Sequence, residues 1–397
     1  MQGENPTYYD IVELFNSDPQ KVRAYLNSNE INGNKKKREK KEQNAKAIEP
    51  EHWYDKDIRG LDQDGIDRLK QLESDVRRGS SHVDRKQIMY LKTLKDLQLE
   101  VPPIFKQDLS PKELYKKLKS FCDQNDIPTE SIKTLLPSLL EWKETGYMRP
   151  CILVGPPGCG KTTCFRKLFE ECLQIPLETI KCPQSATSHG IYGDAGTYQS
   201  ASCGCLANGR IKHKSLIIAF LFDEIDKCSS GSNRISISDE LLSVNDDSVK
   251  DFTDTYLEVK LPGLQHSFFC YTANNLEKIN SILLDRCTVI NFPPADSIRI
   301  KNICRKYVEK KLSTSLYNNV DWDYKLMNES IDNLVDRGVT SLRKHQQLCE
   351  NVLETALDEI FNNPDSDEKI QVTRDMFETA AVEILGITNK KRKVGFG

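Results

Sequence analysis

One short stretch decides the fold: Gly155-Pro156-Pro157-Gly158-Cys159-Gly160-Lys161-Thr162, which fits the pattern G-x-x-x-x-G-K-[ST] of a phosphate-binding loop. Residues 151–154, just before it, form a short apolar run that predicts a buried strand. Residues 165–172, just after it, place apolar side chains at i, i+3, i+4 and i+7, which predicts a helix. A strand, a glycine-rich turn and a helix in this order favour phosphate binding over a turn that binds nothing.

The chemistry of this loop follows from its glycines and its lysine. Glycines let the backbone curl so that its N–H groups point at phosphate oxygens, and the helix N-terminus adds partial positive charge. We expect Lys161 to reach the β- and γ-phosphates of a nucleotide, and the Thr162 hydroxyl to bind Mg²⁺. The predicted nucleotide-contacting residues of this segment are Gly155, Pro156, Pro157, Gly158, Cys159, Gly160, Lys161, Thr162 and Thr163.

A second signal comes later in the chain. Residues 216–222 are apolar throughout, which is typical of a strand in the centre of a parallel sheet, and Asp223 and Glu224 follow at once. Acids at the carboxyl end of such a strand lie beside the phosphate loop. Asp223 is therefore expected to hold Mg²⁺ through water, and Glu224 to polarise the water that attacks the nucleotide.

The composition limits the class of protein. The chain has 397 residues, a net charge of −3 and 13 scattered cysteines, so reduced thiols in a cytoplasmic or nuclear protein are expected. A membrane span and secretion are not expected, because no run of about 18 apolar residues and no apolar leader is present. A metal site at Cys182, His189, Cys203 and Cys205 is a weaker alternative, since this spacing matches no standard zinc pattern.

The chain divides into segments of different composition. We predict a helical and low-complexity N-terminal region at 1–110, a helical lead-in at 111–149 and an α/β domain at 150–295. An all-helical lid at 296–388 and a basic tail at 389–397 complete the chain. The tail and a second basic run at 35–41 are predicted to be solvated segments, nuclear-import signals or nucleic-acid contacts.

These motifs, in this order, resemble AAA+ ATPases, and are most similar to the ATPase module of Lon proteases. The resemblance covers about 130–385. It includes a stretch like the Lon pore loop at Thr197-Tyr198 with Ala201 and Gly204. It continues through Asp223-Glu224-Ile225-Asp226-Lys227, the stretch 252–259, Thr272-Ala273-Asn274 and Leu283-Leu284-Asp285-Arg286. The resemblance implies a P-loop AAA+ parallel sheet with helices on both faces, followed by the helical lid, with ATP and Mg²⁺ as cofactors.

The resemblance also implies roles for single residues. Asn274 corresponds to a sensor that holds the attacking water or the γ-phosphate, and Arg286 to an arginine finger that serves the neighbouring subunit. Arg343 is the candidate for the second sensor, because Thr340 stands where the family has its arginine. Tyr198 corresponds to the aromatic that grips a polypeptide in the pore. The alternatives are a helix-capping Asn274, an Arg286 or Arg343 on the surface, and a Tyr198 packed against its own domain.

Three functions compete on this evidence. The first is a ring homo-oligomer, expected to be hexameric, that remodels or unfolds polypeptides. It would lack a protease of its own, because no Ser-Lys domain follows residue 388. The second is a DNA-directed ATPase that resembles clamp loaders, for which Arg286-Cys287 and the basic runs argue, although Asp285 replaces the usual serine. The third is a degenerate scaffold, against which the intact Lys161 and Glu224 argue.

Overall fold

The structure is a computed structural model, which describes residues 52–80, 84–107, 109–182, 190–194, 201–227, 240–245, 247–362 and 369–386. Apart from His52, the described residues belong to one compact unit that spans 53–397. Both predicted basic runs lie outside the described residues. None of the helices in the described ranges combines the length and the apolarity needed to cross a bilayer.

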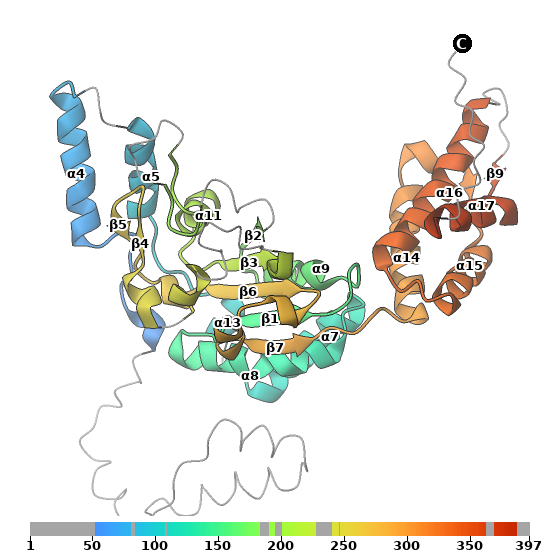
Figure 1. The fold of residues 1–397 in the computed structure, drawn as a ribbon, viewed down its shortest axis with the longest axis horizontal. Helices are drawn as coiled ribbons and strands as arrows, with labels where there is room; N and C mark the ends of the chain where they lie inside the picture. Colours follow the sequence, from blue (N-terminus) through green and yellow to red (C-terminus); the bar gives the residue numbers. More distant parts are fainter. Residues whose placement is uncertain are drawn as a thin grey trace, which may run out of the picture. The chain divides into compact units, whose positions relative to one another are not determined.

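A parallel five-stranded sheet forms the centre of the molecule (Figure 1). Its strands lie in the order β2-β3-β6-β1-β7, and every neighbouring pair is parallel. Strand β6 therefore lies between the strand that precedes the phosphate loop and the strand that ends in the acidic pair. The strands are β1 (Cys151–Val154), β2 (Leu177–Lys181), β3 (Ala219–Asp223), β6 (Phe268–Ala273) and β7 (Thr288–Asn291).

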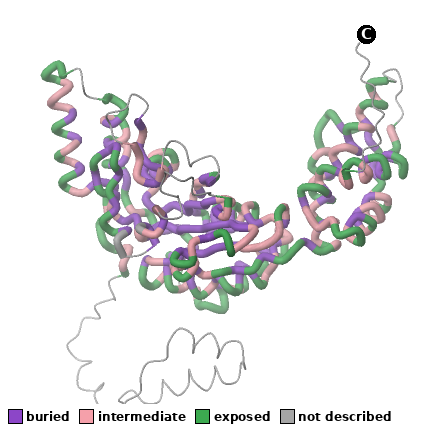
Figure 2. Tube along the Cα trace, viewed as in Figure 1, coloured by how far each residue is buried: buried purple, intermediate pink, exposed green. Residues whose placement is uncertain are grey.

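The sheet is buried on both faces, because its strands are apolar at successive positions (Figure 2). In β3, Phe220 and Phe222 join the core on one face, whereas Ala219 and Leu221 join the core on the other. The Phe220 face is covered by α11 (Cys205–His213), with α4 (Gln63–Arg77) and α5 (Arg85–Lys95) in the same core.

The other face is covered by α7 (Pro111–Gln124), α8 (Thr129–Thr145) and α9 (Lys161–Arg166). Helix α7 begins with a capping box: the Ser110 side chain accepts from the Glu113 N–H, and the Glu113 carboxylate accepts from the Ser110 N–H. Helix α9 continues as a π-helical segment, η2 (Lys167–Cys172). The predicted helices on both faces of the sheet are thus confirmed.

The helices that follow β7 form the lid and have a core of their own, which includes Val308, Leu334 and Leu353. They are α14 (Ser297–Leu312), α15 (Tyr324–Asp336), α16 (Leu342–Asn362) and α17 (Arg374–Ile384). The structure adds a short parallel pair between β8 (Val320–Asp321) and β9 (Ile370–Gln371), so the lid is not made of helices alone. Two-residue strands leave no periodicity that a sequence pattern detects.

Shorter elements connect these layers. They are α6 (Pro103–Lys106), α13 (Ser281–Asp285), the antiparallel pair β4 (Thr253–Asp254) and β5 (Val259–Lys260), and 3-10 turns at Trp53–Asp55, Ile225–Lys227, Leu241–Ser243, Asp247–Asp251, Leu264–His266, Leu276–Lys278 and Ser315–Tyr317. Helices α4 and α5 share a core with the sheet. The domain boundaries expected from the sequence, including that of the helical and low-complexity N-terminal region at 1–110, stay predictions.

Candidate nucleotide site

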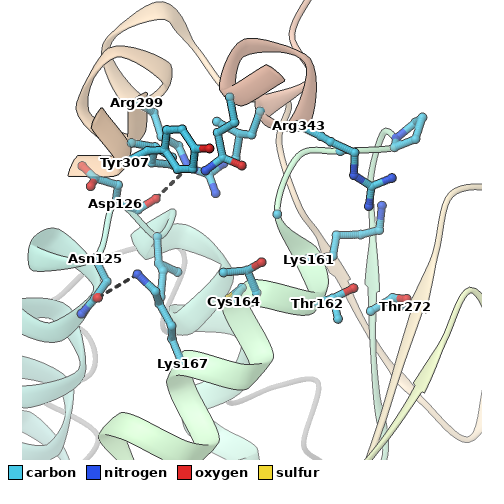
Figure 3. Close-up of a pocket in the computed structure, with 18 of the residues that line it drawn as sticks. Asn125, Asp126, Lys161, Thr162, Cys164, Lys167, Thr272, Arg299, Tyr307 and Arg343 are labelled. Carbon is cyan, nitrogen blue, oxygen red and sulfur yellow. Dashed lines mark hydrogen bonds between the residues drawn. The ribbon is translucent and has the colours of Figure 1, made fainter. Parts of the chain in front are cut away.

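The carboxyl ends of β1, β3 and β6 meet at one edge of the sheet, because these strands are parallel neighbours. A pocket of about 480 Å³ opens there, between the sheet, the loop before α8 and the lid helices α14 and α16 (Figure 3). Most of the predicted site residues line it. The lining residues used below are Asp126, Gly158, Gly160, Lys161, Thr162, Cys164, Asp223, Glu224, Thr272, Asn274, Arg299, Lys306 and Arg343.

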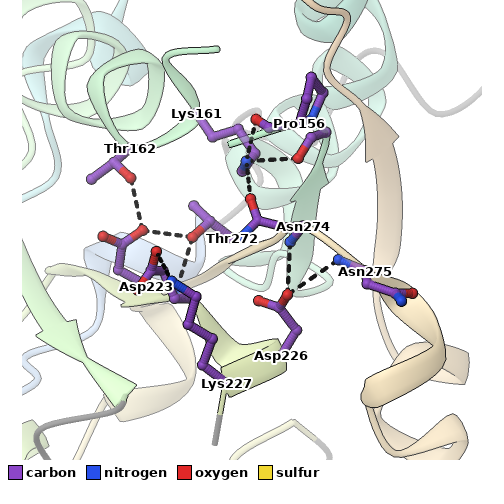
Figure 4. Close-up of polar contacts among 11 residues, drawn as sticks. Pro156, Lys161, Thr162, Asp223, Asp226, Lys227, Thr272, Asn274 and Asn275 are labelled. Atoms are coloured by element: carbon purple, nitrogen blue, oxygen red, sulfur yellow. Dashed lines mark hydrogen bonds and ion pairs between the residues drawn. The ribbon is translucent and has the colours of Figure 1, made fainter. Parts of the chain in front are cut away.

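The phosphate loop has the backbone shape that its glycines predict. Gly158 and Gly160 have φ of 75° and 100°, in the left-handed region that other residues adopt at a cost. The Lys161 ammonium donates to the Gly155 carbonyl at 2.8 Å, to the Pro156 carbonyl at 3.0 Å and to the Asn274 side-chain oxygen at 2.9 Å (Figure 4). Burial lowers the pKa of Lys161, so this cation lies in a site that favours an anionic partner.

Asp223 is the centre of a group of oxygen atoms beside the loop (Figure 4). Its carboxylate accepts from the Thr162 hydroxyl at 2.7 Å and from the Thr272 hydroxyl at 2.6 Å. Thr272 is buried, and the sequence motifs assign no role to its hydroxyl. The signal that could have found it is a hydroxyl at the end of a strand that neighbours the Asp223 strand. Mg²⁺ prefers oxygen ligands such as carboxylates and hydroxyls, so these residues fit the expected ion.

Glu224 is fixed by its backbone rather than by its carboxylate. Its φ of 59° lies in the left-handed region, and its N–H donates to the Thr272 hydroxyl at 2.9 Å. Its carboxylate, 43% exposed, forms an ion pair with the Lys227 ammonium at 2.6 Å, and this contact raises the pKa of Lys227. The candidate base thus stands at the open side of the pocket, where a change of side-chain rotamer would release it from Lys227.

The loop that carries Asn274 is held by a third acid of the same segment. The Asp226 carboxylate accepts from the backbone N–H groups of Asn274 and Asn275 at 3.1 and 3.2 Å. This contact leaves the Asn274 amide directed at Lys161, at the carboxyl end of β6. An amide in this place can contact both the lysine and a water molecule, as the sensor role requires.

The predicted roles of Arg286 and Tyr198 are not tested by this pocket. Arg286 ends α13 outside this pocket, where its guanidinium donates to the Leu242 carbonyl. Its predicted action on a neighbouring subunit stays a prediction. Tyr198, the predicted substrate contact, lies outside the described residues, and so does Thr197.

Two arginines of the lid line the pocket. Arg343 was expected there, and its exposed side chain extends toward Lys161 (Figure 3). Arg299, near the start of α14, was not expected. The residues around Arg299 form no motif, so the local sequence does not predict its contact with the phosphate loop, which is distant in sequence.

The cysteines of the site are buried thiols. Burial raises the pKa of Cys159, and it raises the pKa of Cys164 far above its usual range. Cys182, Cys203 and Cys205 belong to the alternative metal site, whose fourth residue, His189, lies outside the described residues. Within the part of the chain that the structure describes, no group of three or more His, Cys, Asp and Glu side chains could hold a metal ion.

Comparison with known proteins places this site in a family. The model of the ATPase family associated with various cellular activities (AAA) matches residues 151–294. Lon protease of Leptospira interrogans is 30% identical over 267 residues, which are 64% of this chain and 30% of that protein. Lon protease of Methanosphaera stadtmanae is 28% identical over 295 residues, which are 72% of this chain and 34% of that protein. The chain therefore spans about a third of the length of these curated relatives.

Among solved structures, the chain is similar to the RuvB Holliday junction branch migration motor of Thermotoga maritima. The two are 15% identical, with a TM-score of 0.41, over 67% of this chain and 72% of that chain.

Proposed function

We propose that this chain, which belongs to the AAA family through its domain at residues 151–294, hydrolyses ATP with the help of Mg²⁺. One observation carries the proposal. Thr162, Asp223 and Thr272 form a connected set of oxygen atoms, and Lys161 and Glu224 line the same pocket. This arrangement supplies a phosphate-binding cation, oxygen ligands for a divalent ion and a carboxylate base in one pocket.

Binding of the nucleotide requires Lys161 to exchange partners. Its ammonium donates to two backbone carbonyls and to Asn274, and phosphate oxygens would replace these weaker acceptors. Thr162 and Asp223 would hold Mg²⁺, which neutralises charge on the β- and γ-phosphates when it is bound. The residues that approach the terminal phosphate would then be Lys161, Asn274 and the ion ligands.

Glu224 would act as the base that orients and polarises the attacking water. For this it has to leave Lys227, whose ammonium pairs with its carboxylate at 2.6 Å. The pair is half-exposed, so separating its charges requires little free energy. The backbone hydrogen bond from Glu224 to Thr272 keeps the residue beside Asp223 while the carboxylate moves.

The first test separates binding from turnover. Glu224→Gln should bind ATP with wild-type affinity and hydrolyse it at least about 100-fold more slowly, because only the charge that polarises water is lost. Lys161→Ala should lose binding. Glu141→Gln, an exposed position on α8, is the matched control and should behave as wild type. Isothermal titration and a phosphate-release assay give the two readouts. Wild-type turnover in Glu224→Gln would show that Glu224 is not the base.

We further propose a ring-shaped homo-oligomer, expected to be a hexamer, that remodels polypeptides. The similarity to Lon proteases supports this proposal, as does the position of Arg286 outside its own pocket. Unfolded protein should then stimulate ATP hydrolysis, and Tyr198→Ala should abolish the stimulation while the basal rate persists. Stimulation by DNA instead of unfolded protein would favour the clamp-loader-like alternative.

A further inference from the structure

Arg299 lines the nucleotide pocket from the lid, and the sequence motifs do not explain its place there. It lies three residues after the cap of α14, and its own backbone N–H donates to the capping Asp296 at 2.8 Å. Its half-buried side chain lies over the Phe292 ring, with 5.1 Å between the guanidinium carbon and the ring centroid. Burial lowers the pKa of this guanidinium, as expected for a cation removed from water.

The Arg299 guanidinium is only partly satisfied. Nε donates to the backbone carbonyl of Asp126 at 2.7 Å. Nη1 is fully buried and, among the described residues, has no hydrogen-bond partner. The neighbouring Asp126 carboxylate does not supply one; it accepts from Asn302 at 3.1 Å and pairs with Lys306 at 2.5 Å. A buried donor of a charged group without a partner is unfavourable unless a ligand completes it.

The position of the guanidinium points to the ligand. A Cβ placed on Gly160 would lie 3.2 Å from Nη2 of Arg299, so the guanidinium lies against the glycine that precedes Lys161 in the phosphate loop. Figure 3 shows Arg299 on the Asp126 side of the pocket, whereas Arg343 extends toward Lys161. Because Lys161 is expected to reach the outer phosphates of a nucleotide, the place of Arg299 on the other side fits the inner end of the phosphate chain.

We infer that Arg299 is a further nucleotide-binding residue, which donates from the lid to an oxygen of the innermost phosphate. The inference rests on the proposed ATPase function. A guanidinium presents its N–H groups as a planar fork that matches phosphate oxygens, and a phosphate would complete the unpaired Nη1. The same side chain holds the Asp126 carbonyl in the wall of the pocket. Arg299 therefore links the position of the lid directly to the presence of a nucleotide.

The test measures affinity for ligands that differ only in their phosphates. ADP, AMP and adenosine each displace a fluorescent ADP analogue from the full chain, and the displacement gives Kd. Arg299→Met keeps the apolar stem and removes the fork, so Kd for ADP and AMP should rise about 10- to 100-fold while Kd for adenosine stays unchanged. Arg299→Lys restores a point charge without the fork and should recover part of the lost affinity.

Two control variants separate this role from a structural one. Arg305→Met removes an exposed guanidinium from the same helix, 4.8 Å from the Tyr324 ring, and should leave every Kd unchanged. Asn302→Ala removes one bond to the Asp126 carboxylate while leaving the Arg299 guanidinium in place. Thermal unfolding of the nucleotide-free variants reports whether the lid is damaged before any ligand is added.

Three results would overturn the inference. They are an unchanged Kd for ADP in Arg299→Met, an equal loss for adenosine and ADP, and a loss in Asn302→Ala as large as that in Arg299→Met. An equal loss for adenosine and ADP would mean that Arg299 contacts the nucleoside. A loss in Asn302→Ala as large as that in Arg299→Met would mean that Arg299 only holds the wall of the pocket. Should Arg299→Met not fold, the same comparison of ligands in Arg299→Lys decides. A wild-type chain that binds neither ADP nor ATP would overturn the proposed function itself.

Discussion

Substitution of Thr272 tests how Asp223 and Glu224, at the end of β3, are held in place. Its buried hydroxyl donates to the Asp223 carboxylate at 2.6 Å and accepts from the Glu224 N–H at 2.9 Å. Thr272→Val keeps the shape of the side chain and removes both hydrogen bonds. The variant therefore asks whether this single hydroxyl keeps the ion ligand and the base in place.

The magnitude follows from what each partner retains. Asp223 keeps its bond from the Thr162 hydroxyl at 2.7 Å, whereas the Glu224 N–H is left without its acceptor. An unsatisfied donor costs about 1–3 kcal/mol, and a lost bond to a carboxylate adds a similar amount, so we expect a loss of about 2–6 kcal/mol in unfolding free energy. Glu224 has positive φ, which costs about 1–3 kcal/mol when nothing holds it. Its relaxation should lower kcat about 10- to 100-fold.

Urea unfolding and steady-state phosphate release measure the two effects. Thr272→Ser keeps the hydroxyl and should restore most of the stability and the rate. Thr253→Val changes an exposed threonine whose hydroxyl donates to the Asp251 carbonyl, and it should alter neither. The reasoning fails if Thr272→Val retains the wild-type kcat, because the hydroxyl then does not position Glu224.

Three further predictions concern other parts of the site and its assembly. Burial raises the pKa of Asp254 to about 6, above its unfolded value of 3.8. The unfolding free energy should therefore fall by about 3 kcal/mol as pH rises from 3.8 through 6. Urea unfolding of Asp254→Asn, measured across the same pH range, should show a weaker dependence on pH. Inactive Lys161→Ala and Arg286→Ala chains should partly restore ATP hydrolysis when they are mixed, and mixtures that stay inactive at every ratio would argue against an arginine finger. Cys159 and Cys164 should react with a thiol reagent only after unfolding, since burial raises the pKa of both; rapid labelling of native protein at either position would contradict this.

Local sequence patterns determined the parts of this protein that depend on neighbouring residues. The phosphate loop follows from a glycine-rich turn between an apolar run and a helical repeat, and the structure has strand β1 and helix α9 on its two sides. The start of α7 follows from Ser110 and Glu113, whose reciprocal bonds lie within one turn. Such features are encoded by residues a few positions apart, and these keep their meaning in any tertiary context.

Only the tertiary structure decided which distant residues meet. Thr272 joins Asp223 because β6 lies between β1 and β3, and strand order is not written in the periodicity of a single strand. Arg299 meets Gly160 because α14 folds back onto the phosphate loop, although nothing in its local sequence distinguishes it from Arg305 on the same helix. Both contacts form only when long stretches of chain close into loops and separate cores pack together. A local sequence pattern therefore predicts the phosphate loop, but not the distant residues that complete the nucleotide site.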